Sequence, residues 1–492
     1  MQILDRLREQ GVIPTGLSAD SRQVDAGDVF VAIPGARTDG RDYIQAAVAR
    51  GAAAVLFEAP GPAMAESGVP MLAVNQLSRL SGELAHIVYG RPSERLWMVG
   101  VTGTNGKTSV SQWIAQAFSL LGRKCGIVGT LGNGFPGELR ESPNTTPDAI
   151  SVHRTLAGFV AAGADVCAME VSSIGLAEGR TDAVAFDVAV FTNLTRDHLD
   201  YHGSMEAYGA AKQQLFAMPG LASAVINLDD PFGVTLCEGL AGSSVRQIGY
   251  TLGAASAVAG KAGEVIAAEN LVVTGRGISF TARTPQGAAR VAVKLLGRFN
   301  ASNLLAVLGA LLASGVALEP AAAVLGRLVA PPGRMQAVSG GHEEPLVVID
   351  YAHTPDALEQ ALSTLREVSS ARGGSLLCLF GCGGERDPGK RPLMGEVVAR
   401  LADKAVVTSD NPRGENPHSI IADILRGMKQ PGPVEPDRAA AIRAAVMAAN
   451  ANDVVLIAGK GHESTQEIAG RRLPFSDLEQ AHAALGEWRA GA

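Results

Sequence analysis

The chain has few aromatic residues, few cysteines and no long apolar run. Aromatic residues make up 4% of its 492 residues, and cysteine occurs five times. The cysteines stand at positions 125, 167, 237, 378 and 382. This odd number and scattered spacing predict reduced, mostly buried thiols rather than a disulfide framework. Cys378 and Cys382 are separated by three residues, not the two of a zinc knuckle, and no second pair stands near them, so we expect no metal site there.

Membrane and nucleic-acid partners are also not expected. The first residues, MQILDRLREQG, lack the apolar core of a signal peptide. The most apolar run, residues 304–318, contains Gly309, Ser314 and Gly315. It is shorter than the roughly 20 residues of a membrane span, so we expect a buried helix. The net charge of −7 argues against a broad nucleic-acid-binding face. We predict a cytoplasmic protein.

The sequence is otherwise typical of a folded α/β protein. It is 47% hydrophobic and 18% charged, and its length suggests about three domains. Strand-like runs alternate with helix-like runs, which is the pattern of parallel sheets. RPSER (91–95) looks like a linker. The expected strands lie in 27–35, 52–58, 71–75, 96–101, 164–171, 186–194, 223–230, 345–353, 375–384, 402–410 and 452–463. Many run directly into a polar or glycine-rich motif, where open parallel sheets bind ligands.

The segment VGVTGTNGKTSV (99–110) is the strongest local motif. A strand leads into a loop with Gly103 and Gly106, followed by Lys107 and Thr108. Apolar residues at 110, 113, 114, 117, 118 and 121 then predict an amphipathic helix that ends at Gly122. The strict phosphate-loop pattern requires glycine where Val101 stands. A generic glycine-rich turn is the alternative, but strand, loop and helix together favour a nucleotide site.

Polar residues beyond this loop add a possible metal site. Glu170 ends an expected strand, and Lys212 falls on an expected helix. RDHLDYHG (196–203) supplies Asp197, His198, Asp200 and His202. A lone residue of this kind is more often structural. Together at strand ends they indicate a Mg²⁺ site with anion contacts.

Several long motifs follow in a consistent order along nearly the whole chain. They are TGTNGKT (102–108), NTTPD (144–148), EVSSIGL (170–176), FTNLTRDHLDYHG (191–203), AAK (210–212), GRFNASN (297–303), PPGRM (331–335), DYAHTPD (350–356), GCGGERDPGKRP (381–392), DNPR (410–413) and GKGHE (459–463). In these motifs the sequence resembles the Mur ligase family, enzymes that use ATP to build the peptide stem of the bacterial cell wall. The resemblance is closest to members that add the third stem residue.

The resemblance implies an α/β fold of three domains. We expect a small N-terminal uridine-binding α/β domain (1–92), a central P-loop mononucleotide-binding parallel-sheet domain (93–331) and a C-terminal Rossmann-like α/β domain (332–492). ATP would phosphorylate the carboxylate of a UDP-linked muramoyl dipeptide, and the amine of an amino acid would then attack the acyl phosphate.

The resemblance also implies the residues that bind ATP and metal. The expected ATP contacts are Thr102, Gly103, Thr104, Asn105, Gly106, Lys107, Thr108, Asn300, Asn303, Arg334 and Asp350. The expected Mg²⁺ ligands are Thr108, Glu170, His198 and Lys212, the last carbamylated by CO₂. Lys107, Lys212, His198 and Glu170 are the expected catalytic side chains. The alternative for Lys212 is an ammonium that binds phosphate.

The UDP-linked substrate would contact a further set of residues. They are Ser21, Asn144, Thr145, Thr146, Ser172, Glu178 and Arg180. Glu178 departs from the family pattern, because some members carry glutamine there. A carboxylate facing an anionic substrate would repel it unless it were protonated or paired with Arg180.

The tetrapeptide DNPR resembles that of members that add meso-diaminopimelate, which is lysine with a second carboxylate. A fixed arginine suits that carboxylate. The expected contacts are Arg386, Asp410, Asn411, Pro412, Arg413, Gly459 and Glu463. The plain alternative is a surface salt bridge of Arg413 with Asp410 or Glu415. Other functional readings are a ligase adding D-Ala-D-Ala, a folylpolyglutamate synthetase, or a non-catalytic nucleotide switch. We expect small-molecule partners and a monomer.

Overall fold

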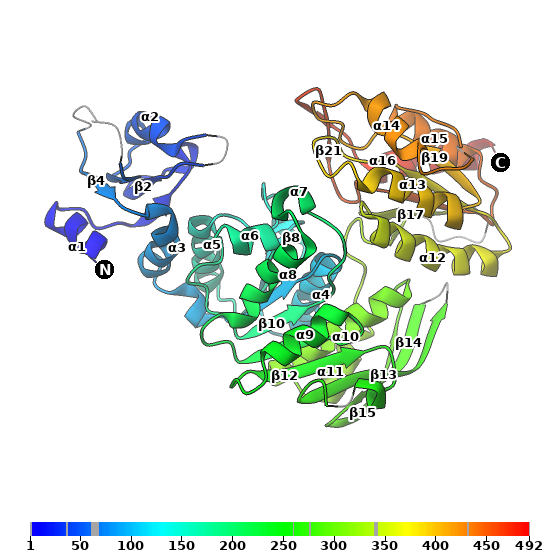
Figure 1. The fold of residues 1–492 in the computed structure, drawn as a ribbon, viewed down its shortest axis with the longest axis horizontal. Helices are drawn as coiled ribbons and strands as arrows, with labels where there is room; N and C mark the ends of the chain where they lie inside the picture. The colour runs from blue at the N-terminus through cyan, green and yellow to red at the C-terminus, as the bar shows by residue number, and fades with distance from the viewer. Residues whose placement is uncertain are drawn as a thin grey trace. The chain divides into compact units, whose positions relative to one another are not determined.

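The computed structural model describes residues 2–35, 38–60, 68–258, 260–274, 277–338, 343–430 and 432–491, and it has the α/β organisation drawn in Figure 1. The chain divides into two compact units. The first comprises Met1–Thr102, Ile114–Val190 and Ala211–Ala224, and the second comprises Gly103–Trp113, Phe191–Ala210 and Val225–Ala492.

The N-terminal part of the first unit is a four-stranded parallel sheet in the order β1-β2-β3-β4. Alternate residues of a strand point to opposite faces, so Val29 and Val31 pack on one side of the sheet and Phe30 and Ala32 on the other. Helices cover both sides, as is usual for parallel sheets. The elements are α1 (Gln2–Glu9), β1 (Gly16–Ser18), η1 (Ser21–Gln23), β2 (Asp28–Ala32), η2 (Gly40–Tyr43), α2 (Ile44–Ala49), β3 (Ala54–Glu58), β4 (Met71–Val74) and α3 (Leu77–Val88).

The rest of the first unit holds strands in the order β10-β5-β9-β6-β7-β8. β9 pairs in parallel with β5 and β6, whereas β6, β7 and β8 pair antiparallel. The elements are η3 (Pro92–Arg95), β5 (Trp97–Thr102), β6 (Cys125–Gly129), β7 (Gly132–Phe135), β8 (Glu138–Arg140), α5 (Ala149–Ala161), β9 (Val166–Glu170), α6 (Ser173–Ala177), β10 (Val188–Phe191) and η4 (Gln214–Ala217). The expected linker at 91–95 is instead a short 3₁₀ helix with a buried Ser93.

The second unit contains the remaining strands of this central sheet, a further sheet and a hairpin. Its strand orders are β15-β14-β13-β12-β11, β16-β17-β20-β18-β19 and β21-β22. The elements are α7 (Leu199–His202), β11 (Ser223–Asn227), α9 (Pro231–Gly239), β12 (Arg246–Thr251), η5 (Ala255–Val258), β13 (Glu264–Thr274), β14 (Gly277–Thr284), β15 (Gly287–Val293), α10 (Arg298–Ala313), α11 (Leu318–Leu325), β16 (Gln336–Ala337), β17 (Leu346–Asp350), α12 (Pro355–Arg372), β18 (Leu376–Phe380), α13 (Lys390–Leu401), β19 (Lys404–Val407), α14 (Pro417–Leu425), α15 (Arg438–Met447), β20 (Val454–Ala458), β21 (Thr465–Ile468), β22 (Arg471–Pro474) and α16 (Asp477–Gly491). α4 (Lys107–Leu120) and α8 (Met205–Gln213) each cross from one unit to the other.

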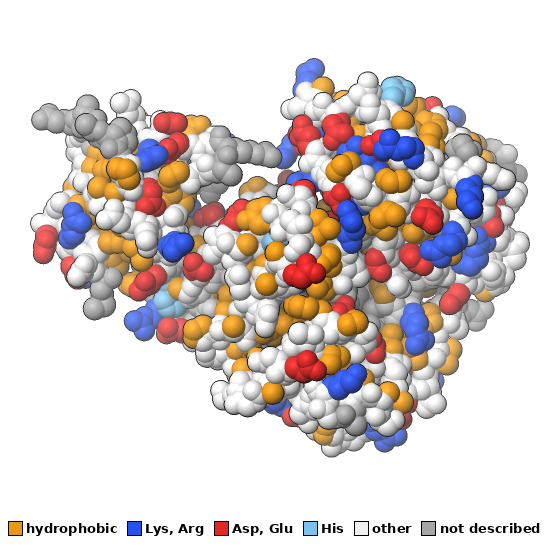
Figure 2. All heavy atoms as spheres, viewed as in Figure 1, with side chains coloured by type: hydrophobic (Ala, Val, Ile, Leu, Met, Phe, Trp, Pro, Cys, Tyr) orange, Lys and Arg blue, Asp and Glu red, His pale blue; other side chains and the backbone are white. Residues whose placement is uncertain are grey.

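The C-terminal sheet is parallel except for β16 and is covered on both faces. One face packs against α12, α13 and α14, and the other against α15 and α16. This two-layered covering of a parallel sheet is the Rossmann-like arrangement that the sequence predicts. On the face of the molecule in Figure 2, basic and acidic side chains are interspersed.

Three local expectations differ from the structure. α4 is buried nearly all round, not on one face only: Ser109, Ser111 and Gln112 are buried together with its apolar residues. The apolar run 304–318 is the expected buried helix only as far as Ala313, where α10 ends, and α11 begins at Leu318. The strands β12 to β15 coincide with none of the strands expected from the sequence. The antiparallel pairs β13–β14 and β14–β15, together with β6–β7 and β7–β8, make the central sheet mixed rather than purely parallel.

Candidate active site

The loop between β5 and α4 has the backbone of a phosphate-binding turn. Gly103 and Gly106 have φ angles of 147° and 87°, in the region that favours glycine. A Cβ at Gly103 would overlap the Thr192 hydroxyl, and one at Gly106 would lie 2.6 Å from Asn303 Oδ1. Glycine is therefore required at both positions by conformation and by space.

Neighbouring backbone and the loop's own lysine fix its shape. Thr104 N–H donates to the Asn193 carbonyl at 2.8 Å, and Asn105 N–H donates to Asn193 Oδ1 at 2.9 Å. Lys107 Nζ donates to the carbonyls of Gly103 and Thr104, both at 2.9 Å. The ammonium thus lies over the loop at the N-terminus of α4, where positive charge attracts phosphate. Thr102, the last residue of β5, is buried in the first unit.

The structure brings the other expected ATP residues of the second unit close to this loop. Arg334 Nη2 donates to Thr108 Oγ1 at 3.0 Å, and its guanidinium stacks 4.2 Å from the centre of the Tyr351 ring. Asn303 Nδ2 donates to Asn300 Oδ1 at 3.1 Å. Aromatic and guanidinium planes with amides beside a phosphate loop are suited to a nucleotide.

The Asp350 carboxylate accepts hydrogen bonds from backbone N–H groups. It accepts from Met335 N–H at 2.7 Å and from Ala352 N–H at 2.8 Å. Burial raises the pKa of Asp350, and Arg334 acts against that rise. Asp350 therefore fixes the segment that follows Arg334.

Asp197, one of the polar residues of RDHLDYHG, lies at the centre of a charged cluster that the sequence did not show. Its carboxylate lies 3.5 Å from His198 Nε2, 3.9 Å from His353 Nε2 and 4.0 Å from Lys390 Nζ. Burial alone would raise the pKa of Asp197, but His353, His198 and Lys390 lower it to about 2. His353 and Lys390 lie within the DYAHTPD and GCGGERDPGKRP motifs. The motifs therefore pointed to these residues, but the distance along the sequence did not show that they approach Asp197.

Glu170 and Lys212 belong to the first unit, and Thr108 and His198 to the second. The buried Glu170 carboxylate accepts from Thr130 N–H at 2.8 Å and from Thr130 Oγ1 at 3.0 Å. Lys212 is 1% exposed and lies on α8, as expected. His198 has a left-handed backbone just before α7.

These side chains fit a hard cation by their chemistry. The Glu170 carboxylate and the Thr108 hydroxyl offer oxygen ligands of the kind that Mg²⁺ prefers, and the expected carbamate on Lys212 would offer more. Within the described ranges, no three His, Cys, Asp or Glu side chains are grouped to hold a metal. The expected ligand set contains only two side chains of those types.

Thr145, Thr146, Ser172, Glu178 and Arg180, five of the seven residues expected to bind the UDP-linked substrate, are connected through hydrogen bonds that include Thr130 and Glu170. Thr145 Oγ1 lies 3.0 Å from Thr130 Oγ1. Thr146 Oγ1 donates to the Glu170 carbonyl at 2.9 Å and lies 3.0 Å from Ser172 Oγ. Ser172 in turn caps α6. The network joins the NTTPD loop to the end of β9.

In the structure, Glu178 is paired with Arg180, which bears on its expected repulsion of an anionic substrate. Arg180 Nε donates to Glu178 Oε2 at 2.8 Å, and Arg180 Nη1 donates to the Thr146 carbonyl at 2.9 Å. The carboxylate is therefore paired, which is one of the two conditions under which it would not repel an anionic substrate.

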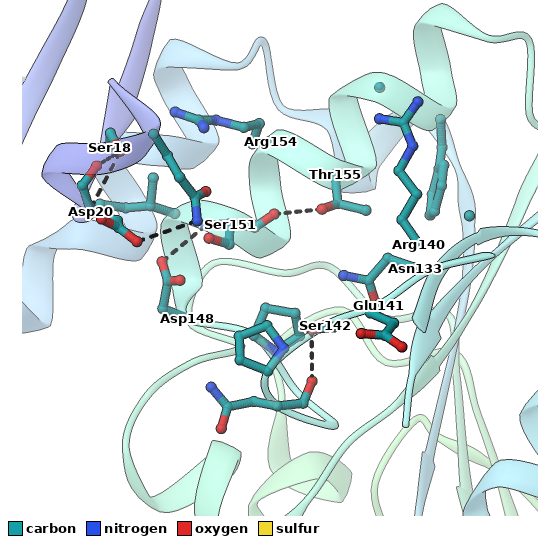
Figure 3. Close-up of a pocket in the computed structure, with 18 of the residues that line it drawn as sticks. Ser18, Asp20, Asn133, Arg140, Glu141, Ser142, Asp148, Ser151, Arg154 and Thr155 are labelled. Atoms are coloured by element: carbon teal, nitrogen blue, oxygen red, sulfur yellow. Dashed lines mark hydrogen bonds between the residues drawn. The ribbon is translucent and has the colours of Figure 1, made fainter. Parts of the chain in front are cut away.

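A cavity of about 1010 Å³ opens beside this network. Figure 3 shows Ser18 and Asp20 at one end and Asn133 and Arg140, from the β7–β8 hairpin, at the other. Asn144 lines the cavity, whereas Ser21 is buried next to the lining residue Asp20.

Arg154, which the sequence analysis missed, lines the cavity between these ends. It donates to Tyr89 Oη at 3.0 Å, lies 3.2 Å from Asp28 and donates to the Leu17 carbonyl. It thereby ties α5 to β1.

The DNPR and GKGHE motifs meet at the carboxyl ends of β19 and β20. Lys460 is fully buried, and its Nζ donates to Asn411 Oδ1 at 3.0 Å and to Glu463 Oε2 at 2.8 Å. Asn411 Nδ2 donates to the same Glu463 oxygen at 2.7 Å. Burial would raise the pKa of Glu463, but Lys460 and Asn411 lower it. Burial raises the pKa of Asp410, which lies 4.0 Å from Lys460 Nζ. Lys460 was not singled out from the sequence.

Arg413 projects from a left-handed backbone, with φ 52°, after the buried Pro412. Its Nη1 donates to the Gly384 carbonyl at 2.6 Å, and its nearest carboxylate is Glu467 at 3.8 Å. The alternative salt bridge is not formed, because Glu415 pairs with Arg391 at 2.9 Å and Asp410 approaches Lys460.

Arg386 and Gly459 complete the expected amino-acid contacts. A Cβ at Gly383 would meet both Arg413 Nη1 and Arg386 Cγ, so the two arginines flank the same glycine. Arg386 is exposed. Gly459 has φ 116°, and a Cβ there would lie 2.5 Å from Asp410 Oδ2.

Family comparisons cover most of the chain. Residues 14–89 match the model described as Mur ligase family, catalytic domain. Residues 101–311 match the Mur ligase middle domain, and residues 333–461 match the Mur ligase, glutamate ligase domain.

Curated relatives are similar along nearly their whole length. A protein of Chromobacterium violaceum is 54% identical over 98% of this chain and 96% of its own length, and one of Pseudomonas aeruginosa is 52% identical over 98% and 96%. Both are named UDP-N-acetylmuramoyl-L-alanyl-D-glutamate--2,6-diaminopimelate ligase. The chain therefore belongs to the Mur ligase family.

Solved structures agree with this assignment. A structure bearing the same ligase name is 37% identical, with a TM-score of 0.66, over 97% of this chain and 95% of that one. MurF from Acinetobacter baumannii, at 19% identity, has a TM-score of 0.68 over 96% and 93% and shows the likeness of fold alone. The expected three-domain α/β fold class is confirmed. The boundaries at residues 92 and 331 stay predictions.

Proposed function

We propose that this chain is an ATP-dependent amide ligase that adds meso-2,6-diaminopimelate to UDP-N-acetylmuramoyl-L-alanyl-D-glutamate. ATP would convert the D-glutamate carboxylate to an acyl phosphate, and the amine of the amino acid would displace phosphate, leaving ADP and phosphate. The product serves peptidoglycan synthesis and hence cell shape and division. The names of the 50–54% identical relatives support this substrate pair.

The chemistry assigns work to the phosphate loop. A carboxylate is a poor electrophile, and phosphorylation supplies a leaving group. Lys107 and the N-terminus of α4 would hold the transferred phosphate, and Arg334 with Asn300 and Asn303 the rest of the nucleotide. Catalysis then rests on positioning and on stabilisation of charge.

The proposed preference for diaminopimelate over lysine rests on the charges of the residues expected to bind the amino acid. Arg413 and Arg386 flank Gly383 and offer two cations, while Asp410 and Glu463 offer carboxylates close by on the strand ends. The far end of diaminopimelate has a carboxylate and an ammonium, which require one group of each sign. Lysine lacks that carboxylate and would leave a guanidinium unpaired.

Mg²⁺ would be bound by Thr108, Glu170, His198 and a carbamylated Lys212. The metal would offset the charge of the phosphates during transfer. Carbamylation would replace a buried ammonium, which repels a cation, by an anion that binds one. This proposal is tested by O-alkylation, which traps the carbamate, followed by mass spectrometry of the peptide that contains Lys212. The exposed Lys404 is the internal control. A peptide with Lys212 unmodified in fully active protein would contradict the proposal.

The first experiment is phosphate release from ATP with the UDP-linked dipeptide and either meso-diaminopimelate or L-lysine. Turnover with diaminopimelate alone is expected. Turnover with lysine would support the ligase activity but contradict the assignment of DNPR to diaminopimelate. Turnover only with D-Ala-D-Ala or with glutamate on a folate would select one of the other ligases, and acceptor-independent hydrolysis would favour the nucleotide switch.

Arg413→Ala should reduce kcat/KM for diaminopimelate about 100-fold, because two charged hydrogen bonds of about 1.5 kcal/mol each are lost. The KM for ATP should not change. Arg426→Ala, which removes an exposed arginine of the same region, is the control and should retain activity. An unchanged KM and rate for diaminopimelate in Arg413→Ala would refute this role.

The proposed setting is the cytoplasm, with the protein acting as a monomer on small-molecule substrates. No helix in the described part of the chain is long and apolar enough to cross a membrane. Sedimentation of the purified chain tests the monomer.

A further inference from the structure

A fully buried ion pair lies next to the DNPR and GKGHE motifs. Arg438 and Asp477 are both 0% exposed, and they form two hydrogen bonds of 2.7 Å, Nε to Oδ1 and Nη2 to Oδ2. Arg438 is the first residue of α15 and Asp477 the first of α16, and these two helices lie together on one face of the C-terminal sheet (Figure 1).

Stability does not account for this pair. Burying two charges costs about as much as their attraction returns, and an apolar pair of similar volume is often at least as stable. Arg438 also lies at a helix N-terminus, where the helix dipole disfavours a cation. A surface arginine on the same helix shows the ordinary alternative: Arg443 binds Glu487 of α16 at 2.7 Å, with both side chains largely exposed.

The remaining hydrogen bonds of Arg438 reach the backbone at the carboxyl ends of β19 and β20. Nη2 donates to the Ala458 carbonyl at 2.9 Å, and Nη1 lies 3.3 Å from the Ser409 carbonyl. Ala458 immediately precedes Gly459, and Ser409 immediately precedes Asp410. One guanidinium therefore joins the backbone at the start of GKGHE to the backbone at the start of DNPR.

The same guanidinium acts on the charge of Asp410. The charged groups around that carboxylate are Arg438, Lys460, Glu463 and Asp477, and Arg438 opposes the effect of burial most strongly. Without Arg438, a buried Asp410 would more readily take up a proton and could no longer attract an ammonium. The backbone contacts and the charge thus act on the same residue.

We propose that the Arg438–Asp477 pair is a positioning device that fixes the Asp410 and Gly459 loops for the incoming amino acid. The proposal rests on the function proposed above in assigning these loops to the amino acid. Asp477 holds the guanidinium in the plane in which it reaches both carbonyls. Neither residue is proposed to touch the substrate.

The main test is the double variant Arg438→Met/Asp477→Leu, which replaces the pair by apolar side chains. The matched control is Arg443→Met/Glu487→Leu, which removes the exposed pair between the same helices. Hydrogen exchange of residues 409–413 and 459–463 should become about tenfold faster in the first variant and stay unchanged in the control. Unchanged exchange in the folded double variant would overturn the proposal.

Kinetics separate positioning from a structural role. The KM for diaminopimelate should rise about tenfold in the double variant, since small displacements of a binding group cost that much or more, while the KM values for ATP and for the UDP-linked dipeptide stay within about twofold. An equal rise in all three KM values would indicate general loosening and would overturn the proposal.

A single variant covers the case in which the double variant does not fold. Asp477→Asn keeps the shape and removes only the charge, and it should give the same pattern with a smaller rise in KM; wild-type kinetics and exchange would count against the pair. The exchange measurement needs no substrate. It therefore decides the positioning role even if the unaltered chain fails to turn over diaminopimelate, an outcome that would reject the proposed function instead.

Discussion

Single residues at this site act through partners that lie far away along the chain. Arg413 was expected from its motif, but its contact with the Gly384 carbonyl, 29 residues away, was not. The Glu178–Arg180 pair shows the opposite case, since two residues so close in sequence could be weighed as a pair from the sequence alone. Local spacing predicts which residue types serve a site, whereas their hydrogen bonds depend on the fold.

His153 should make the first unit sensitive to mild acid. Its side chain is fully buried on α5, Nε2 lies 3.0 Å from the Asp182 carbonyl, and burial lowers its pKa to about 4. The unfolded chain, with a histidine pKa of about 6.5, binds more protons between these values. Above about pH 6.5, His153 therefore does not lower the free energy of unfolding. As the pH drops toward 4, protonation of His153 in the unfolded chain lowers this free energy, by about 2 kcal/mol at pH 5.

Urea unfolding at pH 7 and pH 5 measures this effect. His153→Gln should reduce the loss of stability between the two pH values. His482→Gln, at an exposed position, should leave the loss as large as in the unaltered chain. An equal loss in His153→Gln would show that other groups cause it.

At the scale of elements, a glycine in the phosphate loop is required for both space and backbone conformation, whereas a glycine after a helix is required for conformation alone. Gly106→Ala would place a methyl group 2.6 Å from Asn303 Oδ1 in addition to its strained φ of 87°. Gly122, which ends α4, has φ 79° and open space around it. Gly106→Ala should thus raise the KM for ATP at least about tenfold, since a misplaced loop costs catalysis.

Gly122→Ala is the control for backbone strain. It should lower stability by about 1 kcal/mol and leave the KM for ATP unchanged. ATP titration and thermal unfolding of both variants check the pair. A raised KM in Gly122→Ala as well would mean that strain in α4, rather than overlap in the loop, impairs binding.

Elements differ in how well the sequence predicts them. Buried parallel strands such as β5, β9, β18 and β20 are continuous apolar runs, so they were found. The antiparallel strands β13 to β15 expose alternate residues, as in the pattern of β15, and such half-exposed strands have no apolar run to find. Arg438, Lys460 and the partly buried Arg154 were each missed, because each cation has a partner in another segment of the chain.

At the scale of the whole molecule, the order of motifs predicts more than composition does. Length and charge give only a domain number and exclude some classes of partner. The series from TGTNGKT to GKGHE predicts the fold class through its resemblance to the Mur ligase family, and several of its motifs, such as TGTNGKT, DYAHTPD and GKGHE, follow a strand at the edge where parallel sheets bind ligands. The cavity beside Arg154 and the Asp197 cluster could not be predicted in this way, since they arise where separate motifs meet.

Three outermost strands, β8, β15 and β19, carry charge on their exposed side chains. β8 has Glu138 and Arg140, β15 has Arg290, and β19 has Lys404, all exposed. An outermost strand presents free backbone groups that another chain could extend into a longer sheet, and a charged side chain there makes such growth unfavourable. The chain can therefore be expected to resist aggregation at the high concentrations of overexpression, and replacing these four residues by valine or threonine would remove that protection.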